Sequence, residues 1–209
     1  MARSFRLAPG WRAALALMVV AGCAKPLATL PPPPPAPPPP VSAPVPELER
    51  VQILAAFGTR GSSGGRPWVH AGVDYVGRPG DPVLAGADGV VFQRVTSNPC
   101  GRGLIIEHPT WHRYTLYCHL RRWMVDEHQR VVRGAVVGLV GDSGNTRGRP
   151  HVHLELWKAL PPRSATLAHD AIPDHVLDPH SVIAGCFDPA RTYPTGRFTL
   201  TYPLRCAPP

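Results

Sequence analysis

The chain has 209 residues, enough for one domain of ordinary size with accessory segments, and its 44% apolar content is typical of a globular protein. It carries 22 basic and 14 acidic side chains, and its formal charge of +8 falls to +5 without Arg3, Arg6 and Arg12. This basicity favours contact with polyanions, but it comes with no long Lys/Arg run and no nucleic-acid-binding motif, so we expect no nucleic-acid partner.

Residues 1–22 are expected to form a secretory signal, because a basic start precedes an apolar run too short to span a bilayer as a helix. The tetrapeptide Val20-Ala21-Gly22-Cys23 resembles a bacterial lipobox, in which Cys23 becomes the lipidated first residue of the mature protein. Ala24 follows where an Asp would suggest inner-membrane retention, so the resemblance favours the periplasmic face of the outer membrane. The alternatives are a plain signal-peptidase site near Ala21 or Ala24 and an uncleaved core segment.

Proline dominates residues 31–46, which contain too few apolar side chains to build a core. Such a segment is expected to extend as polyproline II at about 3.1 Å per residue, so the lipidated Cys and linker over residues 23–46 would hold a domain on the order of 50 Å from its lipid. A ligand for a proline-recognition domain is the other interpretation. The globular domain is expected over residues 47–185, with a tail over residues 186–209.

Residues 51–160 contain short segments of strand character separated by Gly, Pro, Asn and Asp. We predict strands at residues 82–84, 89–96, 104–108, 113–120, 135–140 and 151–157. Residues 109–112 would turn one strand back on the next as a hairpin, and residues 164–177 are the one place where a short helix is considered. The expected fold is therefore mainly β, an antiparallel sheet with a short helix or loop extension at the C-terminal end.

Two histidines stand two residues apart in the run Pro150-His-Val-His-Leu-Glu-Leu-Trp157. Strand side chains at i and i+2 share a face, so His151 and His153 would point together and Val152 would point away. Two neutral imidazoles fill an apolar core poorly, but they bind a divalent metal well when another segment brings a third ligand.

The upstream run His70-Ala-Gly-Val-Asp74 could supply that ligand. A histidine and a carboxylate four residues apart, with Gly72 permitting a tight path, can offer a nitrogen and an oxygen to one ion. With one downstream histidine they would make a His2Asp set, which leaves the fourth tetrahedral position to water, as catalytic zinc requires. Alone, the upstream pair would more simply be a surface salt bridge; the two pairs together favour a metal site.

Further blocks stand in order around these two pairs. The full series is His70-Ala-Gly-Val-Asp74, Pro82-Val-Leu-Ala85, Asp88-Gly-Val-Val91, Ile106-Glu-His108, Tyr117-Cys-His-Leu120, Gly138-Leu-Val-Gly141 and Pro150-His-Val-His-Leu-Glu155. In this register the chain resembles the lysostaphin/LytM-type zinc endopeptidases of peptidoglycan. The resemblance covers about residues 57–157, and Asp178-Pro179 extends it to about residue 185.

The resemblance implies that His70, Asp74 and His153 bind zinc and that His119 and His151 are catalytic. Zinc would lower the pKa of water and polarise the scissile carbonyl. The sequence has no HExxH glutamate, so the two catalytic histidines are the candidates for the general base and for the group that stabilises the oxyanion or protonates the leaving amine. Which histidine takes which role stays open.

The function that the resemblance implies is hydrolysis of peptide cross-links or stem peptides of peptidoglycan. A non-catalytic wall-binding regulator of other hydrolases is the second hypothesis, and a zinc-storage or structural lipoprotein is the third. The implied partners are peptidoglycan, a membrane through the lipid anchor, and a cell-envelope protein as a further candidate.

Several other side chains near these motifs have two interpretations. Glu155 shares a strand face with His153 and would either orient its imidazole or be solvated or salt-bridged. Tyr117 alternates with His119, so both are expected on one face, with Tyr117 as a substrate-side phenol or as packing. Residues 141–146 form a turn-rich loop before the HxH strand, which would either line the cleft or, more simply, connect two strands. Histidines expected in turns or polar contexts, without a metal role, are His108, His112, His128, His169, His175 and His180.

Beside Cys23 the chain has four cysteines, and an even number in an exported domain predicts two disulfides in one of three pairings. If residues 109–112 form a hairpin turn, Gly103 lies near Cys118 with Cys100 just beyond it, which favours a Cys100–Cys118 bond. The remaining pair, Cys186–Cys206, would then tie the tail into a loop. No CxxC spacing occurs, so these thiols are not expected to bind zinc.

Overall fold

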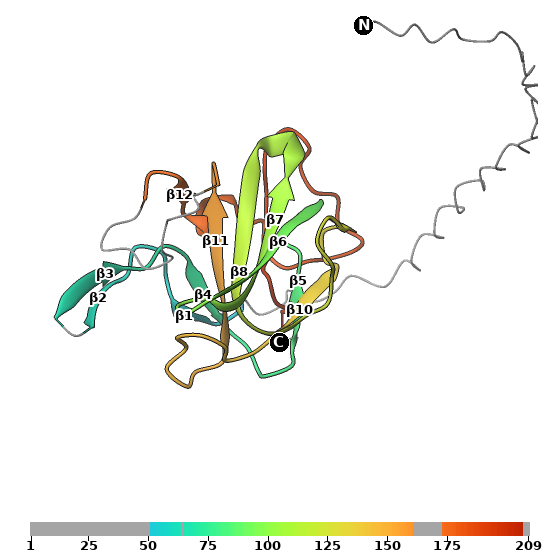
Figure 1. Cartoon of the computed structure of the whole chain (residues 1–209). Helices are drawn as coiled ribbons and strands as arrows, with labels where there is room; N and C mark the ends of the chain where they lie inside the picture. The colour runs from blue at the N-terminus through green and yellow to red at the C-terminus, as the bar shows by residue number, and fades with distance from the viewer. Residues whose placement is uncertain (1–50, 64, 161–172, 207–209) are drawn as a thin grey trace, which may run out of the picture. The chain divides into compact units, whose positions relative to one another are not determined.

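The computed structural model describes residues 51–63, 65–160 and 173–206 (Figure 1). The predicted signal, Cys23 and the proline-rich linker lie outside these residues, as do His169 and most of the predicted helix at 164–177. In the part of the chain that is described, no helix is long and apolar enough to cross a membrane.

The described residues form strands and two short 3-10 helices. Their bounds are β1 Ile53–Ala55, β2 Arg60–Ser63, β3 Arg66–Val69, β4 Val73–Val76, β5 Pro82–Leu84, β6 Gly89–Ser97, β7 Gly101–His108, η1 Pro109–Trp111, β8 Arg113–Trp123, β9 Arg130–Val131, β10 Val136–Val140, β11 His151–Trp157, β12 Val176–Leu177 and η2 Pro179–Val182.

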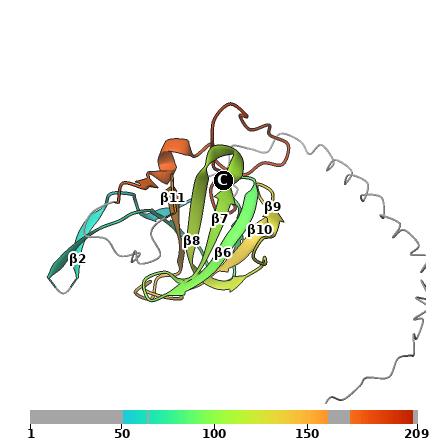
Figure 2. The ribbon, with the colours of Figure 1, turned by 45° about the horizontal axis from the view of Figure 1, so that its top comes forward.

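Ten strands make one sheet with the central order β1-β4-β11-β8-β7-β6-β9, in which β12 joins β11 and β5 joins the sheet through β10. Strands β2 and β3 form a separate hairpin that extends away from the main sheet in both views (Figures 1 and 2). All pairs between these strands are antiparallel, which confirms the predicted fold class.

Each of the six predicted strands corresponds to a strand of the structure. Strands β5 and β11 have the predicted bounds, and β7 and β8 join through η1 as the expected hairpin. The helix considered for residues 164–177 is wrong over its described end, because Val176–Leu177 pairs with β11 as β12. This pairing places Val176 in an apolar cluster with Trp157. The burial of its side chain there stabilises the extended conformation, which a β-branched residue such as valine prefers.

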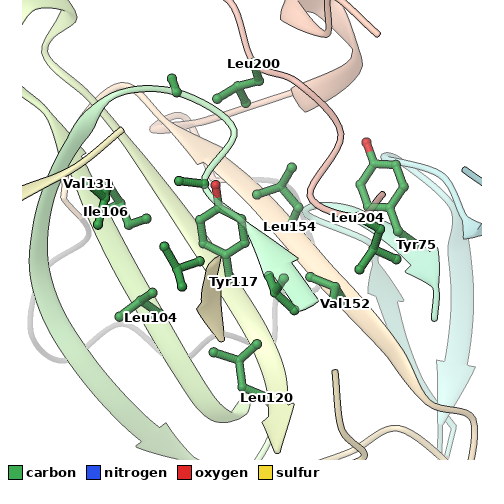
Figure 3. Packing of buried hydrophobic residues seen from close by; sticks show 14 of the residues in the cluster. Tyr75, Leu104, Ile106, Tyr117, Leu120, Val131, Val152, Leu154, Leu200 and Leu204 are labelled. Atoms are coloured by element: carbon green, nitrogen blue, oxygen red, sulfur yellow. The ribbon is translucent and has the colours of Figure 1, made fainter. Parts of the chain in front are cut away.

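The main hydrophobic core lies on one face of the sheet. Alternate side chains of β11, such as Val152 and Leu154, join Tyr117 of β8 in this core, and Leu200 and Leu204 from the C-terminal segment complete it (Figure 3). Burying side chains of this size stabilises the fold by about 1.5–3 kcal/mol each. The tail predicted from the cysteines is therefore part of the core.

Backbone hydrogen bonds and a disulfide hold the C-terminal segment against the domain. The Thr201 amide donates to the Gly86 carbonyl at 2.8 Å, and the Leu84 amide donates to the Pro203 carbonyl at 2.8 Å. Cys186 and Cys206 form a disulfide across this segment. The second disulfide joins Cys100 to Cys118, so the structure has the pairing that the sequence favoured.

Candidate metal centre

Three neighbouring strands bring the distant sequence motifs together on the face opposite the main core. Asp74 of β4 and His153 of β11 are directly paired residues, and Cys118 of β8 pairs with His153 from the other side. His119 follows Cys118, and His70 lies in the segment that joins β3 to β4. The antiparallel order β4-β11-β8 is thus what makes one site from motifs more than 80 residues apart.

The three predicted metal ligands meet at this point. Each of His70, Asp74 and His153 offers one ligand atom, and the three atoms all lie within 4.8 Å of one another. His70 Nε2 is 3.0 Å and His153 Nδ1 is 2.8 Å from Asp74 Oδ1, and the two nitrogens are 3.0 Å apart. His151 joins the group, with its Nε2 3.6 Å from Asp74 Oδ2.

The outer nitrogens of three imidazoles are fixed by backbone carbonyl oxygens. The pairs are His70 Nδ1 with Ala56 O at 3.0 Å, His119 Nδ1 with Ser143 O at 2.9 Å, and His151 Nδ1 with Arg149 O at 2.6 Å. A carbonyl oxygen can only accept, so the nitrogen facing it must carry the hydrogen. In the neutral ring the other nitrogen, Nε2, then keeps a free lone pair, which is the form that a metal ligand or a general base needs.

The fourth imidazole, that of His153, is held through its Nε2 rather than its Nδ1, and its partner is the Glu155 carboxylate. Glu155 is 2% exposed, and its Oε1 lies 2.9 Å from His153 Nε2. Its Oε2 accepts a 2.6 Å hydrogen bond from the Trp157 indole nitrogen. Glu155 is therefore not solvated: it orients His153, with Nε2 turned to the carboxylate and Nδ1 turned to Asp74, and it also forms an ion pair with this ring.

The charges of this cluster stabilise one another. Burial alone would raise the pKa of the Asp74 carboxyl, but its close contacts with the His153 and His70 ring nitrogens hold it well below its usual range. Burial alone would lower the pKa of His153, but hydrogen bonds to Asp74 and Glu155 raise it to about 10. Without a metal, His153 is therefore a protonated ring between two carboxylates, and a bound cation would replace its Nδ1 proton.

The two candidate catalytic histidines have the opposite tendency. Burial lowers the pKa of His119 to about 4, and burial also lowers the pKa of His151. Their ring centroids are 4.5 Å apart, so a proton on one ring disfavours a proton on the other. Both rings are therefore neutral near pH 7, and each can accept a proton.

A β-bulge places His119 in the site and makes one prediction wrong. Strict alternation would put Tyr117 and His119 on the same face, but the register between β7 and β8 shifts by one residue between these positions, and His119 has a φ of +65°. Tyr117 instead points into the main core, fully buried, where its hydroxyl accepts a 2.9 Å hydrogen bond from the Gly86 amide (Figure 3). Tyr117 is a packing residue, and His119 is turned to the cleft.

The loop formed by residues 141–146 lines the cleft through Asn145 and Thr146. The Ser143 carbonyl orients His119, and the Ser143 hydroxyl accepts from the Arg102 amide at 2.9 Å and donates to the Leu120 carbonyl at 2.8 Å. These contacts are made by backbone groups and a common hydroxyl, so no residue pattern could have identified them. Gly72 has a close-approach role, because a Cβ there would meet the Leu154 carbonyl oxygen and, at 2.7 Å, the His153 ring.

The other described histidines stay outside the site. His108 departs from the expected turn or polar context, since it is buried at the end of β7 with Nδ1 2.7 Å from the Asp88 carbonyl and Nε2 3.0 Å from Thr115 Oγ1. Burial lowers its pKa to about 4, so it is a neutral, hydrogen-bonded part of the fold. Among the described residues, one group of acidic, histidine or cysteine side chains is positioned to bind a metal. It consists of His70, Asp74 and His153.

The donor set fits a zinc ion. Two imidazole nitrogens and a carboxylate oxygen are the ligand types that catalytic zinc takes from a protein, and three protein ligands leave room for a fourth partner. The cluster forms the floor of an open cleft of about 750 Å³, which the other two histidines also line. The arrangement can therefore hold a divalent ion within reach of a peptide and beside two proton-accepting rings.

Comparison with known proteins agrees with this geometry. Residues 68–165 match Peptidase family M23. Peptidoglycan DD-endopeptidase ShyC from Vibrio cholerae is 37% identical over 86 residues, which are 41% of this chain and 19% of ShyC. DD-carboxypeptidase/endopeptidase Mpg from Neisseria meningitidis is 39% identical over 88 residues, which are 42% of this chain and 20% of Mpg. The chain thus spans about a fifth of the length of these relatives.

The fold has solved counterparts. The catalytic domain of the antimicrobial peptidase lysostaphin from Staphylococcus simulans superposes with a TM-score of 0.51 at 20% identity, over 65% of this chain and 97% of that domain. At this identity the similarity shows the fold, which is the mainly antiparallel fold described above. Residues 68–165, which contain His70, Asp74, His119, His151 and His153, therefore match Peptidase family M23, and the domain has the fold of the lysostaphin catalytic domain.

Proposed function

We propose that the chain is a zinc-dependent endopeptidase that hydrolyses peptide cross-links or stem peptides of peptidoglycan. The observation that carries the proposal is the convergence of five side chains, with three ligand atoms within 4.8 Å of one another and two further imidazoles beside them. The names of the relatives ShyC and Mpg support peptidoglycan as the substrate class. A regulator without catalytic activity would have no need for the two additional neutral histidines.

His70 Nε2, Asp74 Oδ1 and His153 Nδ1 would hold the zinc ion. When bound, zinc supplies Lewis acidity, which polarises a carbonyl and lowers the pKa of water to about 7. The chain prepares the ligands for this role: a backbone carbonyl fixes His70, and Glu155 fixes His153. Ligands oriented by such outer contacts do not have to reorganise when the ion binds.

His119 and His151 would move the protons of the reaction. Each ring donates its Nδ1 hydrogen to a backbone carbonyl, so each presents Nε2 with a lone pair to the cleft. One ring can accept a proton from the attacking water, and the resulting N–H can then be passed to the leaving amine. The other ring would stabilise the oxyanion once its own Nε2 has taken up a proton, because only an Nε2–H can donate to a negatively charged oxygen.

The direct test is digestion of purified sacculi whose cross-links run from D-alanine to diaminopimelate. We expect soluble muropeptides with opened cross-links, about one zinc per chain by elemental analysis, and loss of activity with a chelator that added zinc restores. His119→Ala is expected to retain zinc and lose cleavage, whereas the surface variant His128→Asn should resemble the wild-type chain. Zinc bound without any cleavage would reject the enzyme and support the wall-binding regulator.

We also propose that Cys23 carries a lipid and that the protein is held at the periplasmic face of the outer membrane. The proposal depends on the tetrapeptide Val20–Cys23 and the basic, apolar segment before it. Metabolic labelling with a fatty acid should mark the wild-type chain and not Cys23→Ala, and fractionation should place the label in the outer membrane. Labelling that persists in the variant would reject this residue as the anchor.

A further inference from the structure

The walls of the cleft carry arginines above the ligand cluster. Arg66 of β3 lines the cleft beside Trp68, and Arg147 and Arg149 line it from the loop that leads into β11. All three arginines are exposed. Below them, the acidic side chains that line the cleft are Asp74 and Glu155, and both already hydrogen-bond to histidines at the floor.

The three guanidinium groups have no acidic partner in the described part of the chain. Among residues 51–63, 65–160 and 173–206, the ion pair recorded for an arginine is Arg94 with Asp126, away from this cleft. A cleft lined by three arginines without acidic partners has a positive potential, and its low-dielectric walls concentrate this potential on a ligand. The walls are therefore suited to a ligand that brings its own negative charge.

The loop that carries Arg147 and Arg149 is held rigidly beside the catalytic histidines. The Arg149 carbonyl accepts from His151 Nδ1 at 2.6 Å, and the Asn145 amide donates to the Pro99 carbonyl at 3.0 Å. Gly144 allows this packing, because a Cβ there would meet the Gly101 amide nitrogen. A group bound by this loop would be placed at a fixed distance from the reacting bond.

The backbone at Arg147 is unusual for an arginine. It has a φ of +53°, in the left-handed region, and the neighbouring Gly148 has a φ of +71°. Glycine adopts this conformation without a steric cost, whereas an arginine does not. Strained backbone of this kind is concentrated at binding and catalytic sites. Arg147, which lines the cleft, therefore adopts a conformation that is more easily adopted by glycine, such as its neighbour Gly148.

We propose that Arg147 and Arg149 of the loop, with Arg66 of β3, bind free carboxylate groups of the peptide beside the bond to be cleaved. The guanidinium group matches a carboxylate with two parallel hydrogen bonds, which gives both affinity and orientation. This inference rests on the proposed function and specifies its substrate: peptides that carry free carboxylates near the cleavage site, in preference to neutral or amidated peptides.

The test uses two forms of one substrate, a cross-linked stem-peptide dimer with free carboxyl groups and the same dimer with these groups amidated. We expect the zinc-loaded wild-type chain to have a kcat/KM at least about tenfold higher for the free acid, since a hydrogen bond to a charged group contributes about that factor. In the double variant Arg147→Gln/Arg149→Gln this ratio should fall towards one. Arg130→Gln, on β9 at the opposite edge of the sheet, is the matched control and should keep the wild-type ratio.

Two results would overturn the inference while leaving the enzyme in place. One is equal kcat/KM for the two substrates in the wild-type chain, and the other is a double variant that keeps the wild-type ratio. Absence of cleavage of both substrates would instead reject the proposed function. In that case calorimetric titration with the same two peptides decides the inference: tighter binding of the free acid, lost in the double variant, supports it, and equal binding overturns it.

Discussion

The two faces of strand β11 show how one segment serves both the site and the core. On one face, His151, His153 and Glu155 are polar, and each makes at least one hydrogen bond, to a backbone carbonyl, Asp74 or Trp157. On the other face the apolar residues Val152, Leu154 and Leu156 are buried in the main core. The strand is central, so both faces are covered, and polar burial is tolerated on one face because its groups are satisfied there.

This comparison predicts that the two faces respond differently to substitution. Changes on the cleft face should mainly affect zinc binding and catalysis, because the removed contacts lie around a ligand site. Changes on the core face should mainly affect the free energy of unfolding, because they remove buried apolar area or leave buried groups without partners.

The largest effect is expected from Asp74→Ala. This carboxylate is the shared partner of His70 and His153, so its loss removes one zinc ligand and the contact that aligns the other two. Muropeptide release should fall at least about a thousandfold, since metal catalysis contributes several kcal/mol to the barrier. Zinc content should fall with it. Retained activity in a zinc-free variant would contradict the assignment of the ligands.

A pair of buried histidines, one on each face, gives the next test. Burial lowers the pKa of both His119 and His108 to about 4. His119 faces the cleft, whereas His108 is hydrogen-bonded to Thr115 inside the protein, away from the cleft. His119→Ala should lower kcat about a hundredfold or more with zinc retained. His108→Ala should lower the free energy of unfolding by about 1–3 kcal/mol and leave the activity of the folded fraction near wild type.

Measurements of kcat, zinc content and denaturant midpoint on these two variants separate the faces. If both variants lose stability equally and neither loses activity selectively, the functional difference between the faces is wrong.

The two disulfides extend the same comparison to covalent bonds. Replacing Cys186 and Cys206 by serine should lower the stability by about 3 kcal/mol, because the bond closes a loop of 20 residues around the core-covering tail, and activity at 25 °C should persist. Replacing Cys100 and Cys118 should also reduce activity, because the His119 amide donates to the Cys100 carbonyl at 2.8 Å. Equal activities of the two double variants would show that the cleft disulfide does not position His119.

The sequence predicted the face of β11 because a period of two follows directly from strand geometry. It could not predict the orientation of His119, because the expected hairpin of β7 and β8 does not reveal that β8 has one extra residue between Tyr117 and Leu120. The ligand set itself followed from a resemblance in several ordered blocks, and the structure brings those side chains together. The oxygens that orient His70 and His119 belong to backbone carbonyls, which leave no signature in residue types.

The burial of the C-terminal tail likewise does not follow from its sequence. Leu200 and Leu204 occur in a short segment rich in proline and threonine, without a strand pattern long enough to indicate burial. Their role becomes visible only when β5 and β10 present the surface that they cover, with the Thr201 amide bonded to Gly86. A local pattern predicts which face of a strand is apolar. Which segment packs against that face depends on the rest of the fold.

The smallest effects are expected from pH, where the buried histidines of the metal-free chain titrate in two opposite ways. The pKa values of His108 and His119 are lowered by burial to about 4, so between about pH 6.5 and 4 the unfolded chain binds more protons and stability falls on acidification, on the order of 1–3 kcal/mol. The pKa of His153 is raised to about 10, so its contribution is complete below the unfolded pKa of about 6.5 and is lost as the pH rises through 10.

Zinc should remove only the second of these dependences. With a metal on Nδ1, His153 has no such proton to lose, so the alkaline loss attributed to it should be present in metal-free protein and absent in zinc-loaded protein. The acid-side loss from His108, on the core face, should persist in both forms. Thermal midpoints measured from pH 4 to 11 with and without zinc test this, and an alkaline loss identical in the two forms would show that His153 is not the residue that zinc and the proton compete for.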